Sequence, residues 1–395
     1  MNSPILSIVI ATRNRTEICI TTIETLLKID SFDFQIILHD NSDNRELEQY
    51  IINNIKDIRL VYKYSNEVLS FVDNFNKALS YVSGFYITAI GDDDGVNPEI
   101  INIAYLAKEK NIESLGCAQS IEYYWPNVIE EFQNGCLLIP TFTGKVSTYD
   151  PSKRLVPLLM SGIVNYIPFN LPRLYHGLIR KDILDKIKLD NNTFLRGLSP
   201  DIYSSIALST IINTHTLIDY PFIISGVCNL SGAAASVNSK HCGKLEDAPH
   251  FRGNKDYKWE AEVPMYYCVE TIWAETALKA IKDHKKESLL KYFNLNFLVA
   301  QSILKNPTIR KLIFDVCRVR LITEKKIFIF FKIKVNLILF ILMLRRFFNL
   351  IYRFFRKKTD NRNYYLDLPN IGYANIKLNE ELSANPIFKI VKFKL

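Results

Sequence analysis

The stretch Phe85-Tyr86-Ile87-Thr88-Ala89-Ile90-Gly91-Asp92-Asp93-Asp94-Gly95 passes directly from an apolar run into three adjacent aspartates. A short apolar run of this kind predicts a buried strand, with the aspartates at its carboxyl end. Adjacent carboxylates repel one another unless a cation or solvent screens them. The stretch therefore predicts a buried strand followed directly by an acidic turn.

Strand and helix signals alternate in the residues before this stretch. The predicted strands are residues 5–10, 34–39, 58–64 and 85–90, and the predicted helices are residues 16–27, 46–55 and 72–82. This order is typical of an α/β fold, in which helices flank a mostly parallel sheet. Ligands of such sheets bind beyond the carboxyl ends of the strands, so residues 12–15, 40–43 and 92–94 are the candidates for a site.

The acidic run at residues 92–94 has two interpretations. An isolated run of three aspartates is more often a solvated turn. At the end of a strand in this topology it indicates a hard divalent ion, Mn²⁺ or Mg²⁺, which takes carboxylate oxygens and completes its shell with phosphate oxygens. The position at a strand end favours the second interpretation.

Composition narrows the class of protein. Of the 395 residues, 48% are hydrophobic and 23% are charged, which is typical of a globular chain rather than a disordered one. The seven cysteines are odd in number and form no C-x-x-C pair, which argues against a disulfide framework or a zinc ribbon and fits a reducing compartment. The first residues lack the basic region and cleavage site of a secretory signal, so we expect none.

Positive charge is concentrated in residues 305–358. This segment holds 15 Lys and Arg and 2 Asp and Glu, a local net charge of +13, whereas the whole chain carries +8. Residues 327–344 are apolar except for Lys332, Lys334 and Asn336, and basic residues recur with aromatic ones further on. The pattern predicts a basic amphipathic helix lying in a membrane interface, and a membrane-spanning helix stays an alternative. Nucleic acid is excluded as a partner, because it would leave the Phe, Ile and Leu residues without a role.

Several motifs resemble family 2 glycosyltransferases, which have the GT-A fold. Residues 7–15 (SIVIATRNR) are similar to that family's opening S-I-V-I-P-T-x-N-R, and residues 38–43 to its second-strand motif. Residues 73–79 resemble the D-N-W-N-R-A-L helix of one subgroup, and residues 91–94 its G-D-D-D form of the DXD motif. A weaker resemblance continues to about residue 235. The Q-x-x-R-W motif of processive members is absent, which favours transfer of a single sugar.

The resemblance implies a set of donor-binding residues. Thr12, Arg15 and Asp40 would line the pocket for the base and ribose of a nucleotide diphosphate sugar. Asp92 and Asp93 would contact the ribose and the donor sugar.

The resemblance also implies a metal site. Asp94 would hold the Mn²⁺ or Mg²⁺ that bridges the two phosphates. His241, in a loop expected to be mobile, is a candidate further ligand, although a lone loop histidine is more often exposed.

Asp201 is the candidate general base. It belongs to a P-D-x-Y segment similar to one in the family, and an inverting transfer needs a base for the acceptor hydroxyl. Pro200 predicts a helix start, so an ordinary carboxylate at a helix N-terminus is the alternative interpretation.

These predictions divide the chain into five parts. Residues 1–110 form the nucleotide-sugar-binding half of a GT-A domain, and residues 111–245 form the acceptor-binding half with the loop. Residues 246–304 are a helical extension, with helices predicted at residues 263–282 and 287–303. Residues 305–358 are the basic membrane-associating segment, and residues 359–395 are a tail.

The sequence thus predicts a metal-dependent inverting glycosyltransferase, peripheral on the cytoplasmic face of the cell membrane. Its expected acceptor is a lipid-linked saccharide of surface polysaccharide synthesis, such as O-antigen or capsule. A nucleotidyltransferase is one alternative, although residues 11–16 lack the Gly and Lys expected of its loop. A non-catalytic membrane-bound scaffold of a polysaccharide assembly complex is the other.

Overall fold

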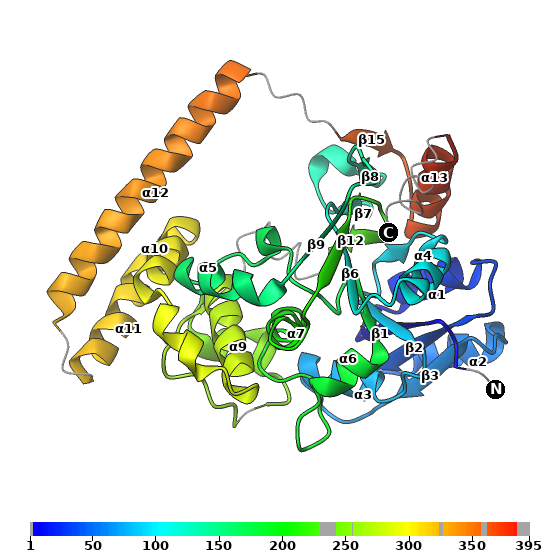
Figure 1. Cartoon of the computed structure of the whole chain (residues 1–395), viewed down its shortest axis with the longest axis horizontal. Helices are drawn as coiled ribbons and strands as arrows, with labels where there is room; N and C mark the ends of the chain where they lie inside the picture. Colours follow the sequence, from blue (N-terminus) through cyan, green and yellow to red (C-terminus); the bar gives the residue numbers. More distant parts are fainter. Residues whose placement is uncertain (1–2, 230–241, 255, 324–326, 357–361, 385–395) are drawn as a thin grey trace.

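The computed structural model describes residues 3–229, 242–254, 256–323, 327–356 and 362–384. Figure 1 shows a sheet region at one side, a helical region beside it, and one long helix, α12, along the outer edge of the helical region. His241 and most of the loop predicted to be mobile lie outside the described residues.

The first ninety residues fold as the predicted alternation of strands and helices. The strands are β1 (Leu6–Thr12), β2 (Phe34–Asp40), β3 (Leu60–Tyr64) and β4 (Tyr86–Ile90), and the helices are α1 (Thr16–Leu27), α2 (Glu46–Asn54) and α3 (Phe71–Leu79). These strands pair in parallel in the order β3-β2-β1-β4. Every predicted boundary falls within three residues of the observed one.

Four later strands complete an eight-stranded sheet. They are β6 (Ser114–Cys117), β9 (Val146–Tyr149), β10 (Gly177–Arg180) and β11 (His215–Ile218), and they extend the order to β3-β2-β1-β4-β10-β6-β11-β9. Strand β10 is antiparallel to both neighbours, and β9 is antiparallel to β11. Six of the eight strands therefore run in one direction, and the predicted α/β class with a mostly parallel sheet is confirmed.

A second sheet lies against the first. Its order is β15-β8-β7-β12-β5, formed by β15 (Asn363–Leu366), β8 (Cys136–Ile139), β7 (Ile121–Tyr124), β12 (Ile223–Val227) and β5 (Gly95–Val96). Strand β5 begins at the residue after the three aspartates, so this sheet fixes the far side of the acidic turn. A two-stranded sheet joins β13 (Cys242–Gly243) to β14 (Tyr267–Cys268).

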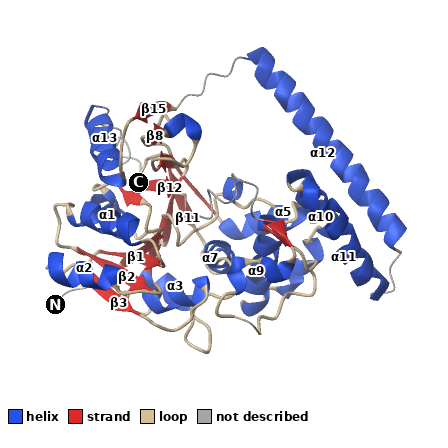
Figure 2. Cartoon of the chain, turned by 180° about the vertical axis from the view of Figure 1, so that it is seen from behind, coloured by secondary structure: helices blue, strands red, loops and turns tan. Residues whose placement is uncertain are grey.

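The remaining α-helices lie after the first four strands. They are α4 (Ile100–Glu109), α5 (Leu155–Met160), α6 (Lys181–Lys186), α7 (Pro200–Ser209), α9 (Val269–Asp283), α10 (Leu295–Lys305), α11 (Arg310–Thr323), α12 (Phe328–Arg356) and α13 (Ile371–Ala384). Apolar residues of α1, α4 and α13 pack on one face of the main sheet, and those of α3, α5, α7 and α9 pack on the other. Figure 2 shows the sheet between these groups of helices.

Two helices are shorter than predicted. The helix predicted at residues 263–282 begins only at Val269, because Pro264 precedes it and a capping box between Cys268 and Thr271 fixes its start. In the helix predicted at residues 287–303, the first part is a 3₁₀ turn (Glu287–Tyr292). The α-helix then starts at Leu295, where the Asn294 side chain accepts a hydrogen bond from the Phe297 amide.

Helix α12 packs along one side only. Phe331, Val335, Leu339 and Leu342 are buried against residues of α10 and α11. Large apolar side chains on its other sides are exposed, among them Phe330, Leu337, Phe340, Phe347 and Phe348. None of the described helices is long and apolar enough to span a membrane.

Candidate active site

Asp92 anchors the start of the acidic turn. Its side chain is completely buried, and its Oδ2 accepts a short hydrogen bond from the Thr12 hydroxyl. Its Oδ1 lies 2.7 Å from Nη2 of Arg15, which follows β1. The predicted donor-binding residues Thr12, Arg15 and Asp92 therefore form one network across the ends of β1 and β4.

Asp94 is held by four hydrogen-bond donors. Its Oδ2 accepts from the Gly91 amide at 2.6 Å, the Tyr175 hydroxyl at 2.8 Å and His176 Nε2 at 2.7 Å. Its Oδ1 accepts from the Gly226 amide at 2.7 Å. Burial alone would raise the pKa of Asp94, but the His176 imidazole and the two amides outweigh it, so this pKa lies below its usual value.

Asp93 is the aspartate of the turn that faces the cavity. Its side chain is 5% exposed, and its Oδ2 accepts no hydrogen bond from nitrogen or oxygen donors among the described residues. The nearest cation, Nη1 of Arg15, is 3.5 Å away, and the Cys228 thiol is a weak donor beside it. Burial, with repulsion from Asp94, raises the pKa of Asp93 to about 7.

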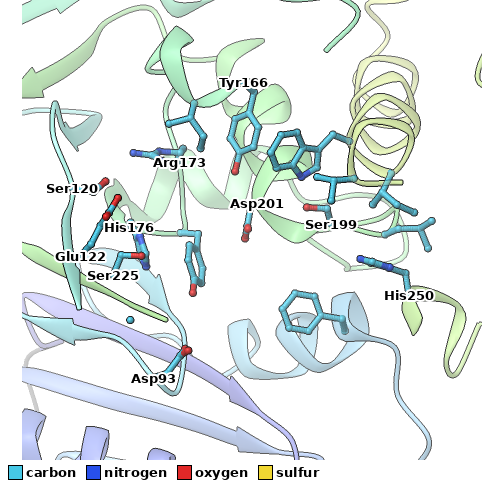
Figure 3. Close-up of a pocket in the computed structure, with 18 of the residues that line it drawn as sticks. Asp93, Ser120, Glu122, Tyr166, Arg173, His176, Ser199, Asp201, Ser225 and His250 are labelled. Atoms are coloured by element: carbon cyan, nitrogen blue, oxygen red, sulfur yellow. The ribbon is translucent and has the colours of Figure 1, made fainter. Parts of the chain in front are cut away.

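A cavity of about 530 Å³ opens in front of the acidic turn (Figure 3). Asp93 and Arg15 line it together with Asp201 of α7. In Figure 3, Arg173 and Tyr166 lie at the opposite end from Asp93, and Asp201 lies below Tyr166. The volume is within the usual range for small-ligand pockets, about 300–1,000 Å³.

Asp201 occupies the predicted place at a helix start. Helix α7 begins at Pro200, so the Asp201 carboxyl lies in its first turn and lines the cavity. No hydrogen bond to this carboxyl comes from the part of the chain that the structure describes. Burial raises the pKa of Asp201 to about 6, although His176 and Arg173 act in the opposite direction.

Asp40 lies away from this cavity. Its side chain is completely buried, with Oδ1 accepting from the Ser42 amide at 2.8 Å and Oδ2 from the Tyr62 hydroxyl at 2.9 Å. Thr12 is also buried and does not line the cavity. The roles of both residues in donor binding stay predictions, as does the role of His241 as a metal ligand.

The sequence did not place Tyr175, His176 or Gly226 beside Asp94. Leu174 and His176 pair through their backbones with Ala89 of β4, which brings Tyr175 and His176 beside Asp94. Gly226 is needed for the approach of β12, since a Cβ there would lie 1.8 Å from the Asp93 carbonyl oxygen. The Tyr-His-Gly segment at residues 175–177 was the sequence signal for these residues, but the sequence did not show that this segment contacts Asp94.

Two Asn side chains of α3, the helix that contains the family-like residues 73–79, connect parts of the site through hydrogen bonds. Asn74 of α3 donates to the Thr12 carbonyl at 3.1 Å and contacts His39 Nδ1 at 2.5 Å. Asn76 accepts from the amides of Phe194 and Leu195, both at 3.0 Å, in the segment that precedes α7. This helix thus connects the loop after β1 to the segment that leads to Asp201.

Comparison with known proteins agrees with this arrangement over the N-terminal third. Residues 7–131 match the family model described as Glycosyl transferase family 2. Over 111 residues the chain is 28% identical to the putative colanic acid biosynthesis glycosyl transferase WcaA of Escherichia coli (strain K12), a match covering 28% of this chain and 39% of that protein. The expected resemblance to family 2 glycosyltransferases is confirmed for this segment, which contains the whole acidic turn and ends before Asp201.

Solved structures give a looser likeness. TarS residues 1–349 of S. aureus with UDP-GlcNAc overlap 86% of this chain and 89% of that one, at 12% identity and a TM-score of 0.43. A structure of S. aureus TarS overlaps 79% of this chain and 55% of that one, at 14% identity and a TM-score of 0.41. These overlaps are too loose to transfer residue roles or substrates.

Proposed function

We propose that this chain is a glycosyltransferase that moves one sugar from a nucleotide diphosphate sugar to an acceptor hydroxyl, with inversion at the transferred carbon. The observation that carries the proposal is the cavity itself. It has the acidic turn of the family 2 segment at one end and the Asp201 carboxyl, free of protein hydrogen bonds among the described residues, facing it. This is the placement that a donor site and a general base require.

Asp201 would accept the proton of the acceptor hydroxyl. As the proton moves, the acceptor oxygen forms a bond to the sugar C1, and the bond from C1 to the diphosphate oxygen breaks, releasing the nucleoside diphosphate. Attack from the face opposite the leaving group inverts the configuration. A pKa near 6 leaves Asp201 mostly ionised at neutral pH and still basic enough to take a proton.

We include a divalent cation at the donor end in the proposal, although the described residues contain no cluster of three or more His, Cys, Asp or Glu side chains arranged for a metal ion. The buried Oδ2 of Asp93 accepts no hydrogen bond from a nitrogen or oxygen donor among the described residues. The single positive charge of Arg15 does not balance the negative charge of the three aspartates. Asp93 would hold Mn²⁺ or Mg²⁺. Asp94 would also bind the ion only if its carboxylate gave up its hydrogen bond with Tyr175 or His176. Such an ion would neutralise charge on the diphosphate leaving group.

Helix α12 supports an acceptor at a membrane surface. Its exposed side carries Phe340, Phe347 and Phe348 beside Arg345 and Arg346. Aromatic residues would enter the acyl boundary, and arginines would meet anionic headgroups. We propose that the chain works peripherally on the cytoplasmic face and glycosylates a lipid-linked saccharide of surface polysaccharide synthesis.

A panel of nucleotide sugars tests the proposal. The purified full-length protein is incubated with each donor, Mn²⁺ and a membrane lipid extract, and the release of nucleoside diphosphate is measured. We expect one donor to be hydrolysed, and the labelled sugar of that donor to appear in lipid. Absence of both hydrolysis and thermal stabilisation with every donor would contradict the proposed class.

A further inference from the structure

The cavity contains two arginines with different surroundings. Arg15 is paired with Asp92 at 2.7 Å, so its charge is already compensated by the protein. Arg173 also lines the cavity and is partly exposed, but it makes no ion pair or side-chain hydrogen bond with the described residues. A guanidinium in such a position is available to a ligand.

The backbone of Arg173 is fixed at the end of the cavity that lies away from the acidic turn. Its carbonyl oxygen lies 2.3 Å from where a Cβ of Gly177 would be, so the turn closes only with glycine there. The residue after Arg173, Leu174, accepts a backbone hydrogen bond from Ala89 of β4 at 2.9 Å. The strand that carries the aspartates therefore also fixes the turn that carries Arg173.

Aromatic side chains form a wall at the same end. The rings of Tyr166 and Trp273 meet edge to face, with centroids 5.2 Å apart, and both line the cavity. Tyr166 is 4% exposed, and its hydroxyl has no hydrogen-bond partner within the described ranges. Figure 3 shows that hydroxyl directed toward Asp201. An apolar ring face beside unpaired polar groups suits a sugar ring, which has C–H faces and hydroxyl edges.

We propose that this end of the cavity is the acceptor subsite and that the acceptor sugar carries an anionic group, a phosphate or a carboxylate, which Arg173 binds. The inference rests on the proposed function and narrows its acceptor class. The planar guanidinium matches both anions through paired hydrogen bonds. The donor diphosphate is the less suitable partner, because Arg173 lies at the end of the cavity opposite Asp93 of the acidic turn.

Binding of three simple sugars to the full-length protein tests the inference. Methyl glucoside, glucuronic acid and glucose 1-phosphate are titrated by calorimetry into the wild type and into Arg173→Gln. We expect the wild type to bind at least one anionic sugar about tenfold more tightly than the neutral one, since hydrogen bonds to charged groups are the stronger ones. Arg173→Gln should abolish that preference, and Arg173→Lys should keep part of it.

The two anionic sugars distinguish the sources of the charge, because a preference for glucose 1-phosphate indicates a phosphate and a preference for glucuronic acid a carboxylate. Arg180→Gln, at an arginine outside the cavity that pairs with Asp182 at 2.6 Å, is the matched control and should behave as wild type. Equal binding of all three sugars by the wild type, including no binding of any, overturns the inference. An anionic preference that survives in Arg173→Gln also overturns it. Nucleotide-sugar binding by the same preparation is measured separately, so failure of the proposed function is recognised independently.

Discussion

Asp92 and Asp94 of the acidic turn differ from Asp201 in how the surrounding protein holds their carboxylates. At the donor end, Asp94 accepts four hydrogen bonds, and Asp92 is held by Thr12 and Arg15. Asp201, which lines the same cavity, accepts none from the described residues. Asp92 and Asp94 are therefore fixed by the protein before any ligand arrives, whereas Asp93 and Asp201 keep carboxylate oxygens for the ligand.

The same difference appears in the pKa values. Asp94 and Asp201 are both enclosed by protein, yet the pKa of Asp94 is lowered and that of Asp201 is raised to about 6. Burial disfavours the ionised form of both, and only Asp94 has enough donors to overcome it. Five predictions, from the largest expected effect to the smallest, test this difference.

The largest effect is expected from removal of the metal. EDTA should reduce transfer by orders of magnitude, and Mn²⁺ or Mg²⁺ should restore it, because the acidic turn has negative charge that Arg15 does not balance. Asp93→Asn should raise the metal concentration needed for half-maximal activity at least about tenfold, since about 1.4 kcal/mol of lost binding is already tenfold. Asp190→Asn, at an exposed aspartate outside the cavity, is the control. Full transfer in EDTA would show that the donor end works without an ion.

The second effect concerns Asp201. Asp201→Asn should lower transfer by about 10²–10⁴-fold, the usual contribution of a general base, with donor binding unchanged. Asp182→Asn makes the same change in the first turn of α6 and should be neutral. Near-normal transfer by Asp201→Asn would falsify the role of base.

The pH dependence of transfer sharpens the same point. The pKa of Asp201 is about 6, so the base is ionised above that pH and becomes protonated below it. Wild-type transfer should therefore fall as pH decreases through about 6, and this acid limb should be absent from the residual rate of Asp201→Asn. An identical limb in both proteins would assign it to another group.

A smaller effect is expected from the charges of α12. Replacing Arg345 and Arg346 together by Gln should weaken binding to anionic vesicles by about 2 kcal/mol, or about 30-fold, at low salt. Lys28→Gln with Lys56→Gln removes the same charge from exposed positions on the sheet region and should have little effect. Equal weakening by both pairs would mean that net charge, not α12, directs binding.

The smallest effect concerns the rigidity of the donor end. Gly226→Ala should destabilise the fold by about 1–3 kcal/mol, because the new Cβ would overlap the Asp93 carbonyl. The thermal midpoint measures this change. Gly372→Ala, where the Cβ meets only side-chain oxygens at 3.0 Å and 3.2 Å, should shift the midpoint less. Equal shifts would mean that the acidic turn can move away from β12.

Much of the structure of residues 1–110 was predictable from the sequence, because the strands are continuous apolar runs and polar residues follow these strands directly. The acidic turn, its strand and the start of α7 at Pro200 are confirmed. The partners of Asp94 were not predictable, since Tyr175, His176 and Gly226 reach it from distant parts of the chain and local periodicity says nothing about such contacts.

The later part of the chain shows the same limit of prediction from sequence. Arg173 and Trp273 belong to no motif, and only folding brings them to one cavity. Strand β15 and helix α13 also escaped prediction, because residues 359–395 were interpreted as a tail. Strand β15 completes the second sheet through its pairing with β8, which the sequence of either strand does not specify.

Helix α13 has a consequence for the order in which the protein is made. Its Asn375 side chain donates to the Val96 carbonyl at 2.6 Å, and Ile371 packs on Gly95, both in the strand that follows the aspartates. A ribosome releases this helix after α12, so the nascent chain exposes α12 before the contacts that hold its acidic turn can form. A C-terminal truncation meant to remove α12 would remove those contacts as well. Internal excision of α12 is therefore the appropriate way to test the proposed membrane binding apart from the proposed catalysis.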